Sequence, residues 1–316
     1  MGRKLEQTLA VLNGLVGDYL SRTGNGLATD MGCYRGGQPV ALDRERFARV
    51  HPDAKPRVAV LVHGVMCTEG IWTLPDGSDY GSLLARDLGF TPLYVRYNSG
   101  LAIADSGAQL AALLQAVVSA YPLEIEELLL IGYSMGGLVI RSACHAAQPA
   151  AHDWLSRVRR IIYVGTPHLG APAERIGRTV ARILGAVDDP YTRLIAEIAD
   201  LRSSGLKDLG NADLRHEDRT RKRSLAWFRD RSHPLPLLAS IRHHLIAGSI
   251  ADPRLAFLFG DSIVPVDSAT YGGIAAAACE LLPEEQVKLL SGVSHLELAH
   301  HPAVYAQIKA WSEPTP

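Results

Sequence analysis

The feature that most constrains the fold is a series of short apolar runs that alternate with stretches of helical periodicity. The runs are RVAVLVH at 57–63, TPLYVRY at 91–97, ELLLIGY at 127–133, RIIYVG at 160–165, HHLIAGS at 243–249 and QVKLL at 286–290. They are apolar on both faces, as in parallel strands that are covered by helices on either side. The alternation predicts a mostly parallel α/β sheet with right-handed crossovers.

The chain is expected to form one catalytic domain, because single α/β domains often run to roughly 250 residues. That domain would comprise 51–170 and 235–316, and a helical cap or lid is predicted at 171–234, where the strand rhythm breaks. Residues 1–50 are predicted to form an amphipathic helix and a hairpin around Gly36–Gly37, both packed on the body. A membrane-surface or dimer contact is the alternative for the helix's apolar stripe.

Composition excludes several classes of protein. The net charge is -1 and nearly half of the residues are hydrophobic, which is ordinary for a globular protein and gives no sign of a nucleic-acid partner. Four cysteines without a CxxC pair indicate neither a zinc knuckle nor a disulfide framework. The first residues show no signal cleavage site, and no run approaches the ~20 apolar residues that span a bilayer, so a cytoplasmic protein is expected.

The strongest local motif is the pentapeptide GYSMG at 132–136, which has a predicted strand directly before it and a helical stretch directly after it. A serine at such a sharp strand-to-helix turn is strained, and flanking glycines are needed because a Cβ there would clash with backbone. The turn would present Oγ of Ser134 at the carboxyl edge of the sheet. Ser134 is therefore the predicted nucleophile.

A serine nucleophile needs a base, and the base needs an acid that orients it. His295 follows the last predicted strand, in the loop SGVSH, so we expect it at the same edge of the sheet as Ser134. His300 and His301 lie near the start of the last predicted helix, where surface or capping roles are expected.

Three aspartates follow the strand at 243–249 and are candidates for the acid: Asp252, Asp261 and Asp267. Asp252 is close to the strand end and precedes a proline, which suggests a turn. Asp261 lies in FGDSIVP, a loop of small residues that could bend a carboxylate toward His295. Asp261 is the preferred acid, and Asp252 stays open as the alternative.

The oxyanion of a tetrahedral intermediate needs two backbone donors. The N–H of Met135, immediately after the nucleophile, is the first candidate. The second is the N–H of Val65, in the loop after the first long strand, where Gly64 lets the backbone turn inward. His63 is expected to brace this loop.

The segments LVHG, GYSMGG, VGTPHLGAP, GDSIVPVDSA and GVSHLEL resemble, in order and spacing, the motif series of bacterial lipases and esterases of the α/β-hydrolase superfamily. A wider similarity includes the GPI inositol-deacylases. The resemblance implies the α/β-hydrolase fold with a cap, a triad of Ser134, Asp261 and His295, and an oxyanion hole of Val65 and Met135. The residues expected to contact substrate are His63, Gly64, Met66, Tyr133, His168 and Leu169. For His168, a structural hydrogen-bonding role is the alternative.

The expected activity is hydrolysis of carboxylic esters through an acyl-enzyme, with a small-molecule or lipid ester as substrate and a transient contact with a lipid interface. A thioesterase, amidase or acyltransferase would use the same triad. A non-catalytic homologue that acts as a binding protein is the alternative of another class. No Walker A, G-x-G-x-x-G or H-E-x-x-H motif occurs, so neither a cofactor nor a metal is expected.

Overall fold

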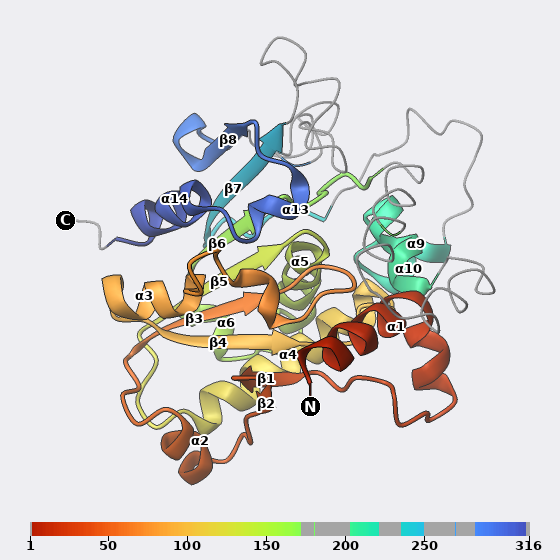
Figure 1. Ribbon diagram of the computed structural model, residues 1–316, viewed down its shortest axis with the longest axis horizontal. Coiled ribbons are helices and arrows are strands. Elements are labelled where there is room, and N and C mark those ends of the chain that lie inside the picture. Colours follow the sequence, from red (N-terminus) through yellow and green to blue (C-terminus); the bar gives the residue numbers. More distant parts are fainter. Residues whose placement is uncertain are drawn as a thin grey trace.

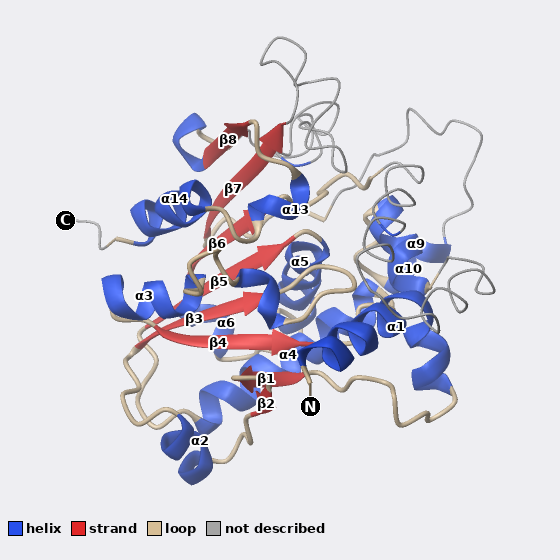
Figure 2. Ribbon diagram, in the orientation of Figure 1, coloured by secondary structure: helices blue, strands red, loops and turns tan. Residues whose placement is uncertain are grey.

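The fold is centred on one eight-stranded sheet (Figures 1 and 2). The computed structural model describes residues 2–171, 180, 203–220, 235–249, 269 and 282–313. The strands are β1 (Gly32–Arg35), β2 (Gln38–Pro39), β3 (Arg57–Val62), β4 (Thr91–Arg96), β5 (Glu127–Tyr133), β6 (Val158–Val164), β7 (Arg242–Ser249) and β8 (Val287–Ser291). Their order is β2-β1-β4-β3-β5-β6-β7-β8, and β3 to β8 are parallel. The predicted parallel α/β sheet is confirmed.

The helices of the main body either connect these strands or, like the last two, follow β8. They are α2 (Arg44–Val50), α3 (Tyr80–Leu88), α4 (Ile103–Ala120), α5 (Met135–Ala147), α6 (Trp154–Arg157), α13 (His295–Leu298) and α14 (Pro302–Ser312), with short 3-10 turns η1 (Glu69–Trp72) and η3 (Glu284–Gln286). Three further helices, α1 (Arg3–Arg22), α9 (Ser204–Asn211) and α10 (His216–Thr220), lie beyond the carboxyl ends of β3, β4 and β5 (Figure 1).

Two hydrophobic cores form on opposite faces of the sheet because neighbouring residues of each strand point to opposite sides. Val58, Val60 and Val62 of β3 belong to the core that contains α4 and α5. Ala59 and Leu61 of the same strand belong to the core that contains α3 and α14. This burial of both faces explains why the strands read as continuous apolar runs.

At the edge of the sheet, β1 pairs antiparallel with β2 and with β4. The β1–β2 hairpin turns at Gly36 and Gly37, which have φ values of 56° and 76°. Glycine adopts this left-handed conformation without steric cost, so the hairpin predicted around the glycine pair is confirmed.

Helix α4 is long and apolar enough, by length and composition, to cross a bilayer, and among the described helices it alone meets that test. Ten of its 18 residues are buried in the fold, where it packs against α5. Its apolar character is therefore that of a core helix.

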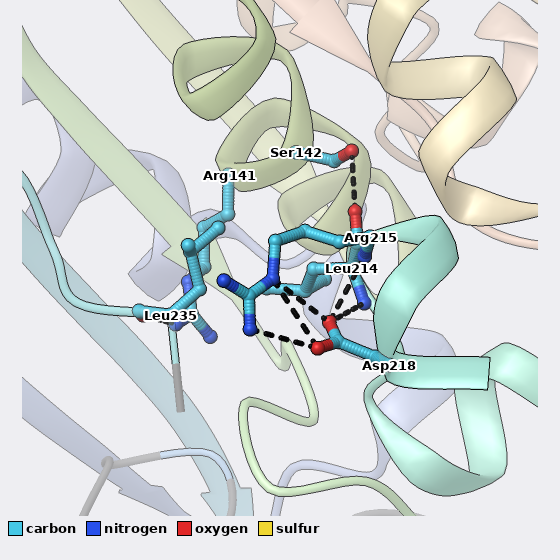
Figure 3. Close-up of polar contacts among 6 residues, drawn as sticks. All are labelled: Arg141, Ser142, Leu214, Arg215, Asp218 and Leu235. Carbon is cyan, nitrogen blue, oxygen red and sulfur yellow. Dashed lines mark hydrogen bonds and ion pairs between the residues drawn. The ribbon is translucent and has the colours of Figure 1, made fainter. Parts of the chain in front are cut away.

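Only part of the predicted cap falls within the described residues, namely 171, 180 and 203–220, and the last of these holds α9 and α10. This segment is anchored on α5, where the hydroxyl of Ser142 donates to the carbonyl of Leu214 at 2.8 Å (Figure 3). Arg215 and Asp218 then form an ion pair at 2.8 Å that closes the turn before α10 (Figure 3). Arg141, the residue before Ser142, donates a hydrogen bond to the carbonyl of Leu235 (Figure 3). Leu235 is the first residue of the described segment that leads to β7.

Candidate active site

Ser134 lies at the turn between β5 and α5 with φ 52° and ψ -122°. This conformation is strained for a residue with a side chain, and such strain persists only where the surroundings hold it. Its N–H donates to the carbonyl of Val164 in β6 at 2.8 Å. The turn therefore fixes Ser134 between two central strands, with 6% of its surface exposed.

The glycines of the pentapeptide are explained by contacts with backbone. A Cβ on Gly136 would lie 2.5 Å from the carbonyl oxygen of His63, and a Cβ on Gly132 would lie 2.6 Å from Cα of Gly137. Real Cβ atoms do not approach backbone so closely, so only glycine fits at either position. The sharp turn at Ser134 therefore depends on both glycines.

His295 is brought to Ser134 from 161 residues away in the chain. Its Nε2 lies 3.0 Å from Oγ of Ser134, which is hydrogen-bond distance. His295 is the first residue of α13, and Ser294 and Glu297 form a capping box that starts this helix. With 2% of its surface exposed, His295 is held inside the protein.

Tyr133 contacts His295 through both its hydroxyl and its ring. Its hydroxyl donates to the carbonyl oxygen of His295 at 3.0 Å, and the two rings lie 5.3 Å apart. The Tyr133 ring also meets Trp72 at 6.2 Å, and both residues are buried. The phenol thus contributes to the placement of the imidazole.

The loop after β3 passes beside Ser134. A Cβ on Gly64 would lie 3.1 Å from Cβ of Ser134, so the backbone of Gly64 runs close to the serine. Val65 follows directly, and Met135 begins α5. Within the described residues, the backbone N–H groups of Val65 and Met135 donate no hydrogen bond.

His63 is completely buried behind this loop. Its Nδ1 lies 2.8 Å from the carbonyl oxygen of Gly64, and its ring stacks on Tyr97 at 4.6 Å. Burial lowers the pKa of His63 to about 4, so the imidazole is neutral near pH 7. These contacts are those of a residue that braces the loop.

His168 is also buried, with its Nδ1 3.2 Å from a guanidinium nitrogen of Arg141 and its ring edge-on to Tyr163 at 4.7 Å. Burial and the neighbouring positive charge of Arg141 lower its pKa well below the usual value. This geometry favours the structural hydrogen-bonding role over contact with substrate. Leu169, next along the loop, keeps part of its surface exposed.

Asp252, Asp261 and Asp267 all lie outside the described residues, so the triad acid stays a prediction. His301 caps α14, since its Nδ1 accepts from the N–H of Ala303 at 3.2 Å, as the sequence predicted.

Two further residues, Gly165 and Ser99, shape the site. Gly165 lies against the imidazole of His295, and the hydroxyl of Ser99 accepts from the N–H of Met66 at 3.0 Å. Gly165 lies in the segment VGTPHLGAP, whose resemblance points to the site without a role for this glycine, and Ser99 belongs to none of the quoted segments. For Ser99, only its position beyond the carboxyl end of β4 could have drawn attention to it.

No group of three or more histidine, cysteine, aspartate or glutamate side chains in the described part of the chain could hold a metal ion. A groove of about 780 Å³ lies beside the β1–β2 hairpin and α3, with Arg35, Asp79 and Tyr94 among its lining residues. Ser134 and His295 are not among the described residues that line it, so it is separate from the candidate active site.

The parallel sheet, the strained serine at the β5–α5 turn and the histidine after β8 are arranged as in the α/β-hydrolase fold. No protein-family model and no curated protein sequence matches the chain. Solved structures do match its fold. A lipase of Bacillus licheniformis, BlEst2, is 17% identical, with a TM-score of 0.51, over 82% of this chain and 93% of the lipase.

Two further similar structures carry related descriptions. The thioesterase RedJ of Streptomyces coelicolor is 15% identical over 88% of this chain and 96% of its own, with a TM-score of 0.46. An α/β hydrolase fold protein of Chitinophaga pinensis is 15% identical over 83% and 91%, with a TM-score of 0.47. At 17% identity, the likeness to the lipase BlEst2 shows the fold alone.

Proposed function

We propose that the protein is a serine hydrolase that cleaves carboxylic esters through an acyl-enzyme on Ser134. The observation that carries the proposal is the 3.0 Å contact between Nε2 of His295 and Oγ of Ser134 at the strained turn. A serine hydroxyl is a weak nucleophile until a base removes its proton, and this contact supplies the base.

In the first half of the reaction, Oγ of Ser134 attacks the ester carbonyl while His295 takes the hydroxyl proton. The carbonyl electrons move to oxygen, and the N–H groups of Val65 and Met135 bind this oxyanion. Met135 is the first residue of α5, so the positive end of a 13-residue helix also faces the developing charge. His295 then gives its proton to the departing alcohol.

In the second half, water replaces the alcohol. His295 takes a proton from water, the hydroxide attacks the acyl-enzyme, and the same oxyanion site stabilises the second tetrahedral intermediate. The carboxylic acid is released and Ser134 recovers its proton. Asp261 is proposed as the acid that holds His295 in the correct orientation, with Asp252 as its competitor.

Hydrolysis of p-nitrophenyl butyrate tests the nucleophile. Ser134→Ala is expected to lower kcat by more than about 10⁴-fold and to abolish labelling by a fluorophosphonate probe, with an unchanged thermal melting curve. Ser119→Ala removes a serine hydroxyl from the surface of α4. It serves as the control, which should keep normal kcat and normal labelling by the probe. Normal turnover by Ser134→Ala would overturn the proposal.

The acid is tested by comparing Asp261→Asn with Asp252→Asn. Loss of orientation lowers kcat by about 10⁴-fold in serine proteases, so the variant at the true acid should fall furthest. Product analysis with a competing alcohol separates hydrolysis from acyl transfer, and an ester chain-length series above and below the micellar limit separates lipase from esterase.

A further inference from the structure

The loop after β3 contains a turn that its own sequence does not favour. Met66 has φ 60°, in the left-handed region that residues with a Cβ rarely adopt. Glycine would be the ordinary residue there. A contact from outside the loop is therefore needed to keep the methionine in this conformation.

Ser99 provides that contact. Its Oγ accepts a hydrogen bond from the backbone N–H of Met66 at 3.0 Å, and both residues are buried. A buried N–H without an acceptor is strongly disfavoured, so the bond ties the backbone at Met66 to Ser99. A second hydrogen bond holds the loop from the residue directly after β4, where the hydroxyl of Tyr97 donates to the carbonyl of His63 at 3.0 Å.

Ser99 is itself fixed by two helices outside the catalytic body. In α1, a Cβ on Gly14 would lie 3.3 Å from both Oγ of Ser99 and the backbone nitrogen of Met66, so the helix rests directly on their bond. In α9, the N–H of Gly205 donates to the carbonyl of Gly100 at 3.0 Å. Ser99 therefore has little freedom to move.

The bond lies one peptide away from the proposed oxyanion donor. Gly64 packs beside Ser134, Val65 follows, and Met66 is the residue that Ser99 holds. Because hydrogen bonds hold the loop at His63 and at Met66, the N–H of Val65 is fixed in one orientation. Rigid orientation of such donors before the reaction is what makes an oxyanion hole effective.

We propose that Ser99 is a positioning residue for the acyl-transfer reaction: its hydroxyl sets the backbone turn at Met66 and thereby aims the N–H of Val65 at the oxyanion. This inference rests on the proposed function. It predicts that loss of the hydroxyl weakens transition-state binding and leaves substrate binding nearly unchanged.

The test is Ser99→Ala, assayed with p-nitrophenyl butyrate and with an aryl trifluoromethyl ketone. Oγ of Ser134 adds to the ketone carbonyl, its proton passes to His295, and the carbonyl electron pair becomes an oxyanion at the proposed site. We expect kcat to fall about 10- to 100-fold, since complete loss of one donor costs about 10²- to 10³-fold. KM should stay within about twofold, and the Ki of the ketone should rise by the factor that kcat/KM loses.

Ser106→Ala is the matched control. Ser106 is as deeply buried as Ser99, but its hydroxyl has no hydrogen-bond partner in the described structure. Its removal should leave kcat and the ketone Ki unchanged. If Ser99→Ala does not fold, Ser99→Cys replaces it, because cysteine fills the position with the same number of side-chain heavy atoms and its sulfur is only a weak acceptor; the same linked loss in kcat and ketone affinity is expected.

Unchanged kcat and ketone affinity in the Ser99 variant, beside an active wild-type protein, would overturn this inference alone. A rise confined to KM, or an equal loss in Ser106→Ala, would also overturn it. No turnover by the wild-type protein on any ester would overturn the proposed function, and this inference with it.

Discussion

The backbone of Gly165 lies directly against the imidazole of His295. A Cβ at this glycine would stand 3.1 Å from both Nδ1 and Cε1 of the ring, and 3.0 Å from a methyl group of Leu298. Gly165 follows β6 and has φ 61°, and its N–H donates to the carbonyl of Ile246 at 2.8 Å. The position of the histidine is thus set by a residue without a side chain.

Gly165→Ala should therefore disturb His295 more than it disturbs the fold. The left-handed backbone costs an alanine about 1–2 kcal/mol of stability, and the new methyl group would shift the ring by a few tenths of an ångström. Misplacement of catalytic groups by about 1 Å costs about 10²-fold in rate, so we expect kcat to fall about tenfold or more. Ester hydrolysis and chemical denaturation measure the two effects.

Gly89→Ala is the control for backbone strain. Gly89 ends α3 with φ 68°, and a Cβ there would meet nothing within 4 Å. Gly89→Ala should lose about as much stability as Gly165→Ala and should keep full activity. If both variants kept normal kcat, the contact between Gly165 and His295 would have no catalytic consequence.

A second prediction concerns Gly17, where helix α1 meets the loop after β4. Alanine in a helix interior is usually about 1 kcal/mol more favourable than glycine. Here a Cβ would lie 2.7 Å from Cγ of Asn98. That amide cannot move cheaply, because its Nδ2 donates to the carbonyl of Gly17 at 2.9 Å and its Oδ1 accepts from Gly100 at 3.0 Å.

Gly17→Ala should thus lower the free energy of unfolding by about 1–3 kcal/mol, as overpacking does, despite the gain in helix propensity. Urea denaturation measures it. Gly26→Ala, at a position where a Cβ meets nothing within 4 Å, should be close to neutral. A more stable Gly17→Ala protein would mean that α1 does not rest on Asn98 in solution.

The strands and the serine–histidine pair could be read from the sequence for a physical reason. A parallel strand buried on both faces leaves an apolar run that needs no other context. Reactive groups at the carboxyl ends of parallel strands share one edge, so GYSMG and SGVSH predicted that Ser134 and His295 would meet. The 3.0 Å contact agrees with that reasoning.

The supporting residues could not be predicted in this way. The bond from Met66 to Ser99 depends on how two loops and α1 pack together, and a lone serine carries no pattern that reveals it. Gly165 stands in the quoted segment VGTPHLGAP, but its positive φ and its contact with His295 exist only in the assembled fold. Asp261 lies outside the described residues, so its place in the triad still rests on sequence.

A third prediction tests how α9 and α10 are attached to the catalytic body. The Ser142 hydroxyl donates to the carbonyl of Leu214 at 2.8 Å in a buried setting (Figure 3). Ser142→Ala leaves that carbonyl without its donor, so we expect a loss of about 1–3 kcal/mol. Compared with wild type, amide hydrogen exchange should be accelerated more in residues 203–220 than in the sheet.

Ser119→Ala is the matched control for this bond. Its hydroxyl donates to the carbonyl of Gln115 at 3.0 Å, but the bond is exposed, so water can replace it and stability should change by less than about 0.5 kcal/mol. Equal exchange rates at 203–220 in Ser142→Ala and wild type would show that the bond does not hold this segment.

The last prediction concerns acid stability, which buried histidines should limit. Burial lowers the pKa of His63, His243 and His244 to about 4, from an ordinary value near 6.5. Between pH 6.5 and 4 the unfolded chain therefore binds more protons than the native protein. The contribution of these histidines to the free energy of unfolding should be constant above pH 6.5. It should decrease as the pH falls from 6.5 to 4, by up to about 1.4 kcal/mol per pH unit for each histidine.

His244→Phe isolates one of these histidines. The His244 ring stacks on Trp311 at 4.6 Å, and its Nδ1 has no partner in the described structure, so phenylalanine can keep the stack without a lost bond. The variant should match wild type near pH 7 and lose stability less steeply toward pH 4.5, since carboxylates titrate alike in both proteins. Urea midpoints across this range measure the slopes, and parallel curves would show that His244 keeps an ordinary pKa in the folded protein.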